Sequence, residues 1–235
     1  MVHTYWLGLD DTDMPGTPGT NQLAKALAAA LRPLMTCRQI VRHQLLDDPR
    51  VPYTSKNGSA SLMLVSDTPV DLDELFEYVA VFVQRRAEPG SDPGICLAVD
   101  VPPAVEEFGR QCQLQLSDQE TARQVAAAAG MRLRGLGGTE GGVIGALAAV
   151  GLACGGNDGR IVYWRDADSG TGWMDVSQLK HLGVDVVRLQ EGTTIHQGIV
   201  NVGKHLRPNV RAHRAVLFVE PSAEADSHWE AVRLL

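Results

Sequence analysis

The sequence predicts a protein of the mixed class, α/β or α+β. Short apolar runs with strand character alternate with stretches of helical periodicity along the 235 residues, and this interleaving is typical of a sheet covered by helices. The hydrophobic content of 44% and the charged content of 21% are ordinary for a globular protein. A chain of this length can bury a large core, in one large domain or two small ones.

The first hundred residues contain three expected strands, two expected helices and a further apolar stretch. The strands are expected at residues 3–9, 59–66 and 94–101, the helices at 21–32 and 71–86, and the apolar stretch lies at 38–46. The second helix is the best supported, because apolar residues recur at helical spacing from Leu72 to Val83. Asp71 and Asp73 lie in its first turn, where the helix dipole favours acids.

The second half continues the alternation. Ser117 and Glu120 form the pattern of a capping box for a helix that ends near Ala129. A further helix is expected at 143–153, a strand at 160–165, a helix or turn at 176–182 and a final strand at 215–220. The strand–helix–strand block at about 59–101 has the size of a ferredoxin-like subdomain inserted into the rest.

Three acids follow the first expected strand directly. Asp10, Asp11 and Asp13 lie within four residues, and a compact site that holds all three carboxylates needs a cation. Mg²⁺ bound to phosphate oxygens suits such a site, because it accepts a few carboxylates and keeps the remaining ligand positions for water and substrate. The chain must leave the strand by Asp11 if the three side chains are to converge. The alternative is that the three acids only form part of a turn after the strand, where aspartate is common.

Thr20 lies at the expected start of the next helix. A threonine there is a suitable N-cap, and a helix N-terminus with free N–H groups attracts phosphate. Its hydroxyl is also a candidate phosphoryl acceptor. Together with the acids, Thr20 predicts a magnesium–phosphate site at the end of the first strand.

A glycine-rich loop at 135–142 precedes the helix expected at 143–153. Five of its eight residues are glycine, among them Gly137, Gly138, Gly141 and Gly142. Glycines allow backbone N–H groups to approach a polyphosphate closely, so the loop is predicted to hold phosphates. It matches neither G-x-x-x-x-G-K-[ST] nor a clean G-x-G-x-x-G pattern, and the alternative is a flexible connector.

Basic residues occur in two places that suit phosphate. The segment from Tyr53 to Gly58 ends a loop that leads into a strand. Lys56 could neutralise phosphate charge there, while Asn57 and Gly58 form an ordinary turn signal. A late basic run spans residues 204–214 and could face ATP phosphates or RNA, or be a solvated loop. His43, just upstream of the first of these places, is expected to be a structural histidine.

The overall charge and the cysteines exclude several classes of protein. A net charge of −7 argues against binding nucleic acid over the whole surface. The four cysteines are far apart and form no C-x-x-C pair, so reduced thiols in a cytoplasmic protein are expected. The sequence shows no apolar run of membrane-spanning length and no signal peptide.

Taken together, these segments resemble the catalytic core of the archaeal agmatidine synthetases, which modify a cytidine in an isoleucine tRNA. The family has a G-[IL]-D-D-T-D segment, here residues 8–13, and a threonine-bearing loop and helix, here Thr20 and Asn21. Its N-P-x-[VI]-P…K-T-R-G-N-[GA]-A segment is similar to residues 48–60, and its glycine loop and G-A-L-A-A-[IV]-G helix to residues 137–151. The resemblance extends over residues 3–165.

The resemblance implies an ATP-dependent enzyme with a kinase-like domain and an inserted ferredoxin-like domain. The expected division is a discontinuous ATP-binding domain of residues 1–58 and 131–235 around a ferredoxin-like subdomain of residues 59–130. By the same resemblance, Asp10, Asp11 and Asp13 would bind Mg²⁺, and Thr20 would take phosphate from ATP. Lys56 and its turn, with the 137–142 loop, would contact ATP. A phosphorylated carbonyl oxygen would then be displaced by agmatine.

Two departures from the family bear on the substrate. Full-length members continue into an OB fold and a zinc ribbon that hold tRNA, whereas this sequence ends at Leu235 without a C-x-x-C pair. Gly19 stands in place of a cysteine and Asn21 in place of a second threonine. We therefore expect the ATP chemistry to carry over better than the tRNA substrate, and an agmatine-like amine and a small carbonyl substrate remain open.

Two other functions also remain open. Asp11-Thr12-Asp13-Met14 approaches the D-x-D-x-[TV] signature of magnesium-dependent phosphatases of the haloacid dehalogenase type, although Pro15 occupies the Thr/Val place. The later acid pair that such a site needs is not evident, since Asp47 and Asp48 come early and in a turn. A protein that binds Mg–ATP without turning it over is the other alternative.

Overall fold

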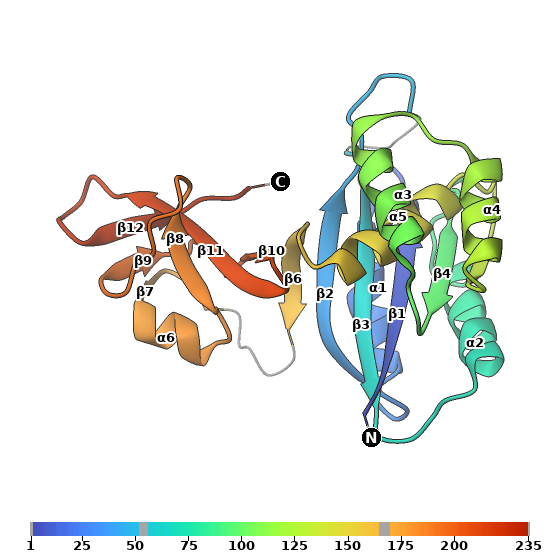
Figure 1. Ribbon diagram of the computed structural model, residues 1–235, viewed down its shortest axis with the longest axis horizontal. Coiled ribbons are helices and arrows are strands. Elements are labelled where there is room, and N and C mark those ends of the chain that lie inside the picture. The colour runs from blue at the N-terminus through green and yellow to red at the C-terminus, as the bar shows by residue number, and fades with distance from the viewer. Residues whose placement is uncertain (1, 52–55, 165–169, 235) are drawn as a thin grey trace.

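The computed structural model describes residues 2–51, 56–164 and 170–234. It has a larger lobe, up to residue 164, and a smaller β-rich lobe (Figure 1). The larger lobe contains β1 His3–Asp10, α1 Thr20–Ala30, β2 Thr36–Gln44, β3 Gly58–Ser66, α2 Leu72–Gln84, β4 Gly94–Ala98, α3 Pro103–Leu114, α4 Gln119–Ala128, β5 Arg132–Gly135, α5 Val143–Gly155 and β6 Arg160–Trp164. The smaller lobe contains β7 Trp173–Asp175, α6 Val176–His181, β8 Val186–Leu189, β9 Ile199–Asn201, β10 Asn209–Arg211, β11 Arg214–Pro221 and β12 His228–Ala231.

One sheet runs through both lobes. Its strand order is β5-β4-β1-β3-β2-β6-β10-β11-β12-β9-β7, with β8 paired in parallel to β11. Within the larger lobe every pairing is antiparallel, and β1 lies between β3 and β4. The expectation of a mixed α/β fold is confirmed.

The two faces of β1 carry different helices. Tyr5, Leu7 and Leu9 point to a core shared with α1 and α2, since successive strand residues alternate between faces. Gly8 points to the other face, where α3, α4 and α5 pack (Figure 1). A Cβ on Gly8 would lie 2.0 Å from the carbonyl oxygen of Ala146, so this glycine lets α5 approach the middle of the sheet.

The smaller lobe has its own apolar core. Residues of α6, β8, β9 and β11 form it, with Leu179 and Val200 fully buried. The sheet passes from one lobe to the other through β6 and β10, whose register contains the single pair Arg160 and Asn209. The C-terminal end of the chain lies between the two lobes (Figure 1).

The boundary expected at residues 58 and 59 falls at the start of β3, within the sheet of the larger lobe. β3, the first element of the expected 59–130 subdomain, pairs with β1 along seven residues and also with β2. Residues 59–130 therefore share a sheet and two cores with residues 1–58. The β-rich part that stands apart is the smaller lobe, which the expected division had assigned to the ATP-binding domain.

Several local expectations need correction. The capping box at Ser117 is not formed, because Asp118 is the N-cap of α4 and its side chain accepts from the amide of Thr121 at 2.7 Å. The strand expected at 94–101 ends at Ala98. The strand expected at 215–220 is not the last, since β12 follows it. Among the elements that sequence reasoning did not find are α3, β5, β7, β8, β9, β10 and β12.

Within the part of the chain that the structure describes, none of the helices combines the length and the apolar character needed to cross a membrane.

Candidate functional site

The acid segment after β1 and the start of α5 line the same cleft. The cleft has a volume of about 1520 Å³, and segments more than a hundred residues apart form its walls. The predicted site residues that line it are Asp10, Asp11, Asp13, Thr20, Lys56, Asn57, Gly58, Gly141 and Gly142. Gly137 and Gly138, which were expected to contact ATP, are not among the lining residues.

Asp11 is the point at which the chain turns out of the strand. β1 ends at Asp10, and Asp11 has a φ of +48°, a left-handed conformation that is uncommon for residues other than glycine. The turn follows the expectation that the chain leaves the strand by Asp11. A strained conformation of this kind persists only where the surrounding structure enforces it.

Burial and neighbouring charges raise the pKa of two of the acids. Burial raises the pKa of Asp10 to about 8, and the charge of Asp11 adds to the effect. Its carboxyl lies against α5, where a Cβ on Gly145 would come within 1.9 Å of Oδ2. Burial likewise raises the pKa of Asp11 to about 6, together with the charges of Asp92 and Asp13. Both carboxyl groups are therefore harder to ionise than an ordinary aspartate, and Asp10 more so than Asp11.

Asp13 organises the start of α1. Its Oδ1 accepts a hydrogen bond from the amide of Thr20 at 3.1 Å and another from the Thr20 hydroxyl at 2.9 Å. Thr12 donates from its own hydroxyl to Thr20 Oγ1 at 3.1 Å. Gly19, not Thr20, is the N-cap, so the predicted capping role of Thr20 is wrong. Thr20 is instead the first residue of the helix, with its hydroxyl held by a carboxylate.

The glycine loop is held by a carboxylate that the sequence analysis did not single out. Asp92 accepts hydrogen bonds from the amides of Glu140 at 2.5 Å and Gly141 at 3.0 Å, and from the Thr139 hydroxyl. These N–H groups are the kind expected to hold phosphate, and here an internal anion occupies them. Asp92 also lines the cleft and faces Asp11 closely enough to raise its pKa.

Close packing explains several of the glycines. A Cβ on Gly142 would lie 2.4 Å from the carbonyl oxygen of Asp92, and one on Gly94 would lie 2.1 Å from the backbone of Gly142. The start of α5 therefore rests directly on the backbone of β4. This packing draws the N-terminus of α5 toward the acid segment, so the glycines shape the cleft even where their amides do not face it.

Two residues of the segment at Lys56 make close contacts within the protein. Asn57 donates from its side-chain amide to the carbonyl of Leu46 at 2.8 Å, which ties the loop to the end of β2. Gly58 leaves room for the guanidinium of Arg42, because a Cβ there would lie 2.7 Å from its Nη2. Lys56 is exposed at the edge of the cleft. Residues 52–55, including Tyr53, lie outside the described residues.

The three acids do not form a preformed metal cage. Across residues 2–51, 56–164 and 170–234, the structure contains no group of three or more histidine, cysteine, aspartate or glutamate side chains arranged to hold a metal ion. The Asp10 carboxyl lies against α5, and the Asp13 carboxylate accepts a hydrogen bond from the Thr20 hydroxyl. Mg²⁺ usually takes one or two carboxylates together with substrate phosphates, and Asp11 and Asp13 are the pair that fits this smaller role.

A serine, a histidine and an aspartate also meet outside the cleft. His43 donates from Nδ1 to Oδ2 of Asp158 at 2.7 Å, since a carboxylate can only accept, and its Nε2 lies 2.8 Å from Oγ of Ser61. Gln113 donates to the other oxygen of Asp158. His43 is 0% exposed and Ser61 2% exposed, so the trio is closed to substrate. It is a structural network, as expected for His43.

Known proteins resemble this chain in their fold. No family model matches the sequence, and no curated protein matches it. Three solved structures resemble the chain with 22–24% identity: a tRNA fluorescent labeling enzyme, and TiaS bound to an isoleucine tRNA with ATP or with AMPCPP and agmatine. The TM-scores are 0.55, 0.55 and 0.54. Over 63–76% of its length, this chain shares the fold of part of TiaS.

The solved structures match only part of this chain, and this chain matches only part of theirs. The first two structures cover 63% of this chain and 36% of their own length, and the third covers 76% and 44%. The chain thus spans less than half the length of each. TiaS is an agmatidine synthetase that acts on an isoleucine tRNA, so the resemblance predicted from the motifs is confirmed at the level of the fold.

Proposed function

We propose that this chain is a Mg²⁺- and ATP-dependent phosphotransferase or amine ligase with the chemistry of the agmatidine synthetase core. The observation that carries the proposal is the shared cleft, in which Asp11, Asp13 and Thr20 face the start of α5. The fold of TiaS, seen with ATP in one complex and with AMPCPP and agmatine in another, supports the same choice of nucleotide.

The first step would be phosphorylation of Thr20. Its Oγ1 attacks the γ-phosphorus of ATP, the bond from that phosphorus to the β–γ bridging oxygen breaks, and ADP leaves. Asp13 accepts the hydroxyl proton through the 2.9 Å hydrogen bond already in place. The hydrogen bond from Thr12 orients the same oxygen. Asp11 and Asp13 would hold Mg²⁺, which would supply positive charge against the negative charge that develops on the transferred phosphoryl group.

The second step would use the phosphoryl group to activate a carbonyl. The carbonyl oxygen of the acceptor attacks the phosphorus on Thr20, and the released Thr20 oxygen takes back the proton. An agmatine-like amine then attacks the activated carbon, inorganic phosphate leaves with the former carbonyl oxygen, and the nitrogen loses a proton. RNA and small carbonyl compounds are both acceptors to test, because the chain covers only part of TiaS.

The phosphatase alternative gains no support from the site. The acid pair Asp47 and Asp48 does not line the cleft, and Asp48 is paired with Arg50 at the surface. A nucleotide-binding protein without turnover would have the same cleft, so only an experiment separates it from the enzyme.

The deciding experiment is to incubate the protein with γ-labelled ATP and to measure label that remains on the chain. We expect label on the wild-type protein only when Mg²⁺ is present, and its loss in Thr20→Val. Thr20→Ser, which restores a hydroxyl, should recover it. Thr68→Val is the matched control, because Thr68 is exposed and does not line the cleft.

Each other outcome points elsewhere. Unchanged labelling of Thr20→Val would remove Thr20 from the mechanism. Binding of an ATP analogue without labelling of the wild type would favour the non-catalytic alternative. Release of phosphate from a simple phosphomonoester without ATP would favour the phosphatase. Binding of the analogue by Thr20→Val would show that this variant is folded.

A further inference from the structure

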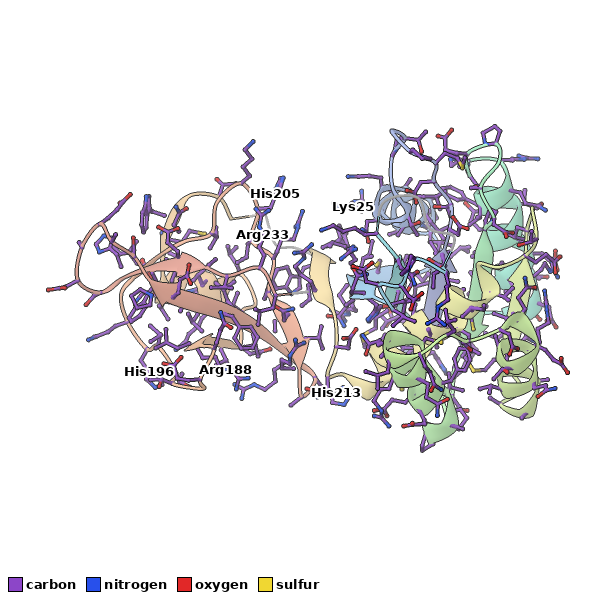
Figure 2. The ribbon with its side chains drawn as sticks, turned by 90° about the horizontal axis from the view of Figure 1, so that it is seen from above. Lys25, Arg188, His196, His205, His213 and Arg233 are labelled. Carbon is purple, nitrogen blue, oxygen red and sulfur yellow. The ribbon has the colours of Figure 1, made fainter. Side chains whose placement is uncertain are left out.

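Five cationic side chains gather where the two lobes meet. Lys25 on α1, Arg42 on β2 and Arg160 on β6 belong to the larger lobe, and Arg207 and Arg233 belong to the smaller one. Figure 2 shows Lys25 on the edge of the larger lobe, with Arg233 and the exposed His205 on the facing edge of the smaller one. Arg42, Arg160 and Arg233 line the same cleft as Asp11 and Thr20. We call these five residues the cationic wall.

Two members of the cationic wall are direct cross-strand neighbours. Arg42 and Arg160 occupy opposite positions in the register of β2 and β6, and like charges directly opposite each other destabilise a sheet. Nε of Arg160 is buried and has no hydrogen-bond partner, although a buried donor normally has one. Nη2 of Arg42 donates to Oε1 of Gln44 at 2.9 Å, a neutral acceptor. Within the described residues, the fold therefore maintains two adjacent guanidinium groups that form no ion pair.

No acid compensates for these charges in the part of the chain that the structure describes. None of the seven ion pairs there includes a member of the cationic wall. Burial lowers the pKa of Arg160, and the charges of Arg42, Arg233 and Arg207 add to the effect. Burial likewise lowers the pKa of Lys25, with a contribution from Arg207. The members are thus close enough to repel one another.

The size of the cleft leaves room for more than a nucleotide. Pockets for one small ligand measure roughly 300–1,000 Å³, and this cleft is larger at about 1520 Å³. Under the proposed function, ATP would occupy the side of the cleft that the acids and the start of α5 form. The cationic wall contributes three guanidinium groups to the lining of the same cleft, and those groups suit the oxygens of a phosphate ester.

We propose that the cationic wall binds the phosphate groups of the second substrate, a phosphate ester that spans the two lobes while ATP occupies the acid side of the cleft. The identification of this ligand as a substrate rests on the proposed function, whereas anion binding at the wall does not. The phosphate could belong to a mononucleotide-sized molecule or to an RNA strand. Both sources present the same oxygens to Arg42, Arg160 and Arg233.

The test measures binding of three probes in the absence of turnover. They are inorganic pyrophosphate, a short fluorescent single-stranded RNA, and a non-hydrolysable ATP analogue with Mg²⁺. The variant is Arg160→Gln combined with Arg233→Gln. We expect it to lose at least about tenfold in affinity for whichever phosphate probe the wild type binds, since each charge-assisted hydrogen bond contributes about that much. Affinity for the ATP analogue should change by less than about threefold.

The control variant removes the same charge elsewhere. Arg32→Gln combined with Arg85→Gln changes two exposed arginines that do not line the cleft, and it should bind every probe like the wild type. Folding is checked by thermal unfolding. The test variant should be at least as stable as the wild type without ligand, because it relieves repulsion. Where the wild type binds pyrophosphate, this probe should raise the Tm of the wild type and of the control, but not that of the test variant.

The outcomes distinguish the two sources of phosphate and test the proposal itself. Binding of pyrophosphate alone supports a small phosphate ester, and binding of RNA alone supports a strand. For RNA, the slope of log affinity against log salt should fall by about 0.7 for each phosphate contact removed. The proposal is overturned if the wild type binds neither probe, or if the test variant binds like the control. It is also overturned if pyrophosphate displaces the ATP analogue and both weaken equally. Failure of Thr20 labelling would leave the anion-binding result intact.

Discussion

Removal of the Asp158 carboxylate tests the buried network that anchors β6. Asp158 accepts from His43 on β2 and Gln113 on α3, and it lies two residues before Arg160 of the cationic wall. Asp158→Ala leaves the Nδ1 donor of His43 without a partner in a side chain that is 0% exposed. Gln113 keeps a second acceptor, the carbonyl of Gln44 at 2.9 Å. The loss therefore falls mainly on His43.

The expected cost follows from these contacts. Removing the acceptor of a buried donor costs about 1–3 kcal/mol. We take the upper end, about 3 kcal/mol, because the acceptor is a carboxylate and the donor side chain is 0% exposed. Burial alone would raise the pKa of Asp158, but the hydrogen bond and charge of His43 hold it below the ordinary value. Its stabilising effect is thus present above an ordinary carboxyl pKa and is lost as the pH falls below it.

The assay is urea unfolding of the wild type and of Asp158→Ala at neutral and acidic pH. We expect the difference in unfolding free energy at neutral pH to shrink in acid, where the wild-type carboxylate is protonated. Asp100→Ala, at an exposed aspartate, should stay within about 0.5 kcal/mol of the wild type. A loss of less than about 1 kcal/mol in Asp158→Ala would refute the stabilising role of the network.

Two further predictions concern the site and the packing beneath it. Asp10→Asn should flatten the pH dependence of stability. Burial and the charge of Asp11 raise the pKa of Asp10 to about 8 in the folded protein. The metal-free wild type should therefore lose stability as the pH rises from about 4 to 8, by up to about 1.4 kcal/mol per pH unit. Parallel urea-unfolding profiles for the two proteins in EDTA would contradict this. Gly8→Ala should cost about 1–3 kcal/mol in thermal or urea unfolding, because its Cβ would lie 2.0 Å from the Ala146 carbonyl. Gly137→Ala, with its nearest neighbour at 3.5 Å, is the control, and an equal loss in both would argue against close packing at Gly8.

Strong local patterns predicted the larger elements of the fold. The apolar run of β1 and the helical spacing in α2 place in the core most of the apolar residues that they single out. α3 was not found because two prolines and a low apolar content hide it, although proline at the first position of a helix is common. β5 is four partly buried residues whose place depends on β4, so pairing across the sheet determines it and its own sequence does not.

The candidate site was predictable where its residues are neighbours in sequence. The acids and Thr20 lie within eleven residues, and their spacing brought them to one loop and one helix start. Asp92 was missed because its partners lie in the glycine loop nearly fifty residues later. A carboxylate before Pro93 at the entrance to a strand is an ordinary loop signal. The cationic wall was missed because its members are scattered from Lys25 to Arg233, and only the tertiary fold brings them together.

The narrow part of the sheet between β6 and β10 couples the geometry of the two lobes to the cleft. A register of one pair, Arg160 with Asn209, is flanked by a small apolar cluster that includes Ile161 and Val210. A rotation of one lobe against the other about this junction would change the distances between side chains of the two lobes. Arg207 and Arg233 would then travel along an arc while Arg42 stays fixed, so the spacing of the guanidinium groups measures the angle between the lobes.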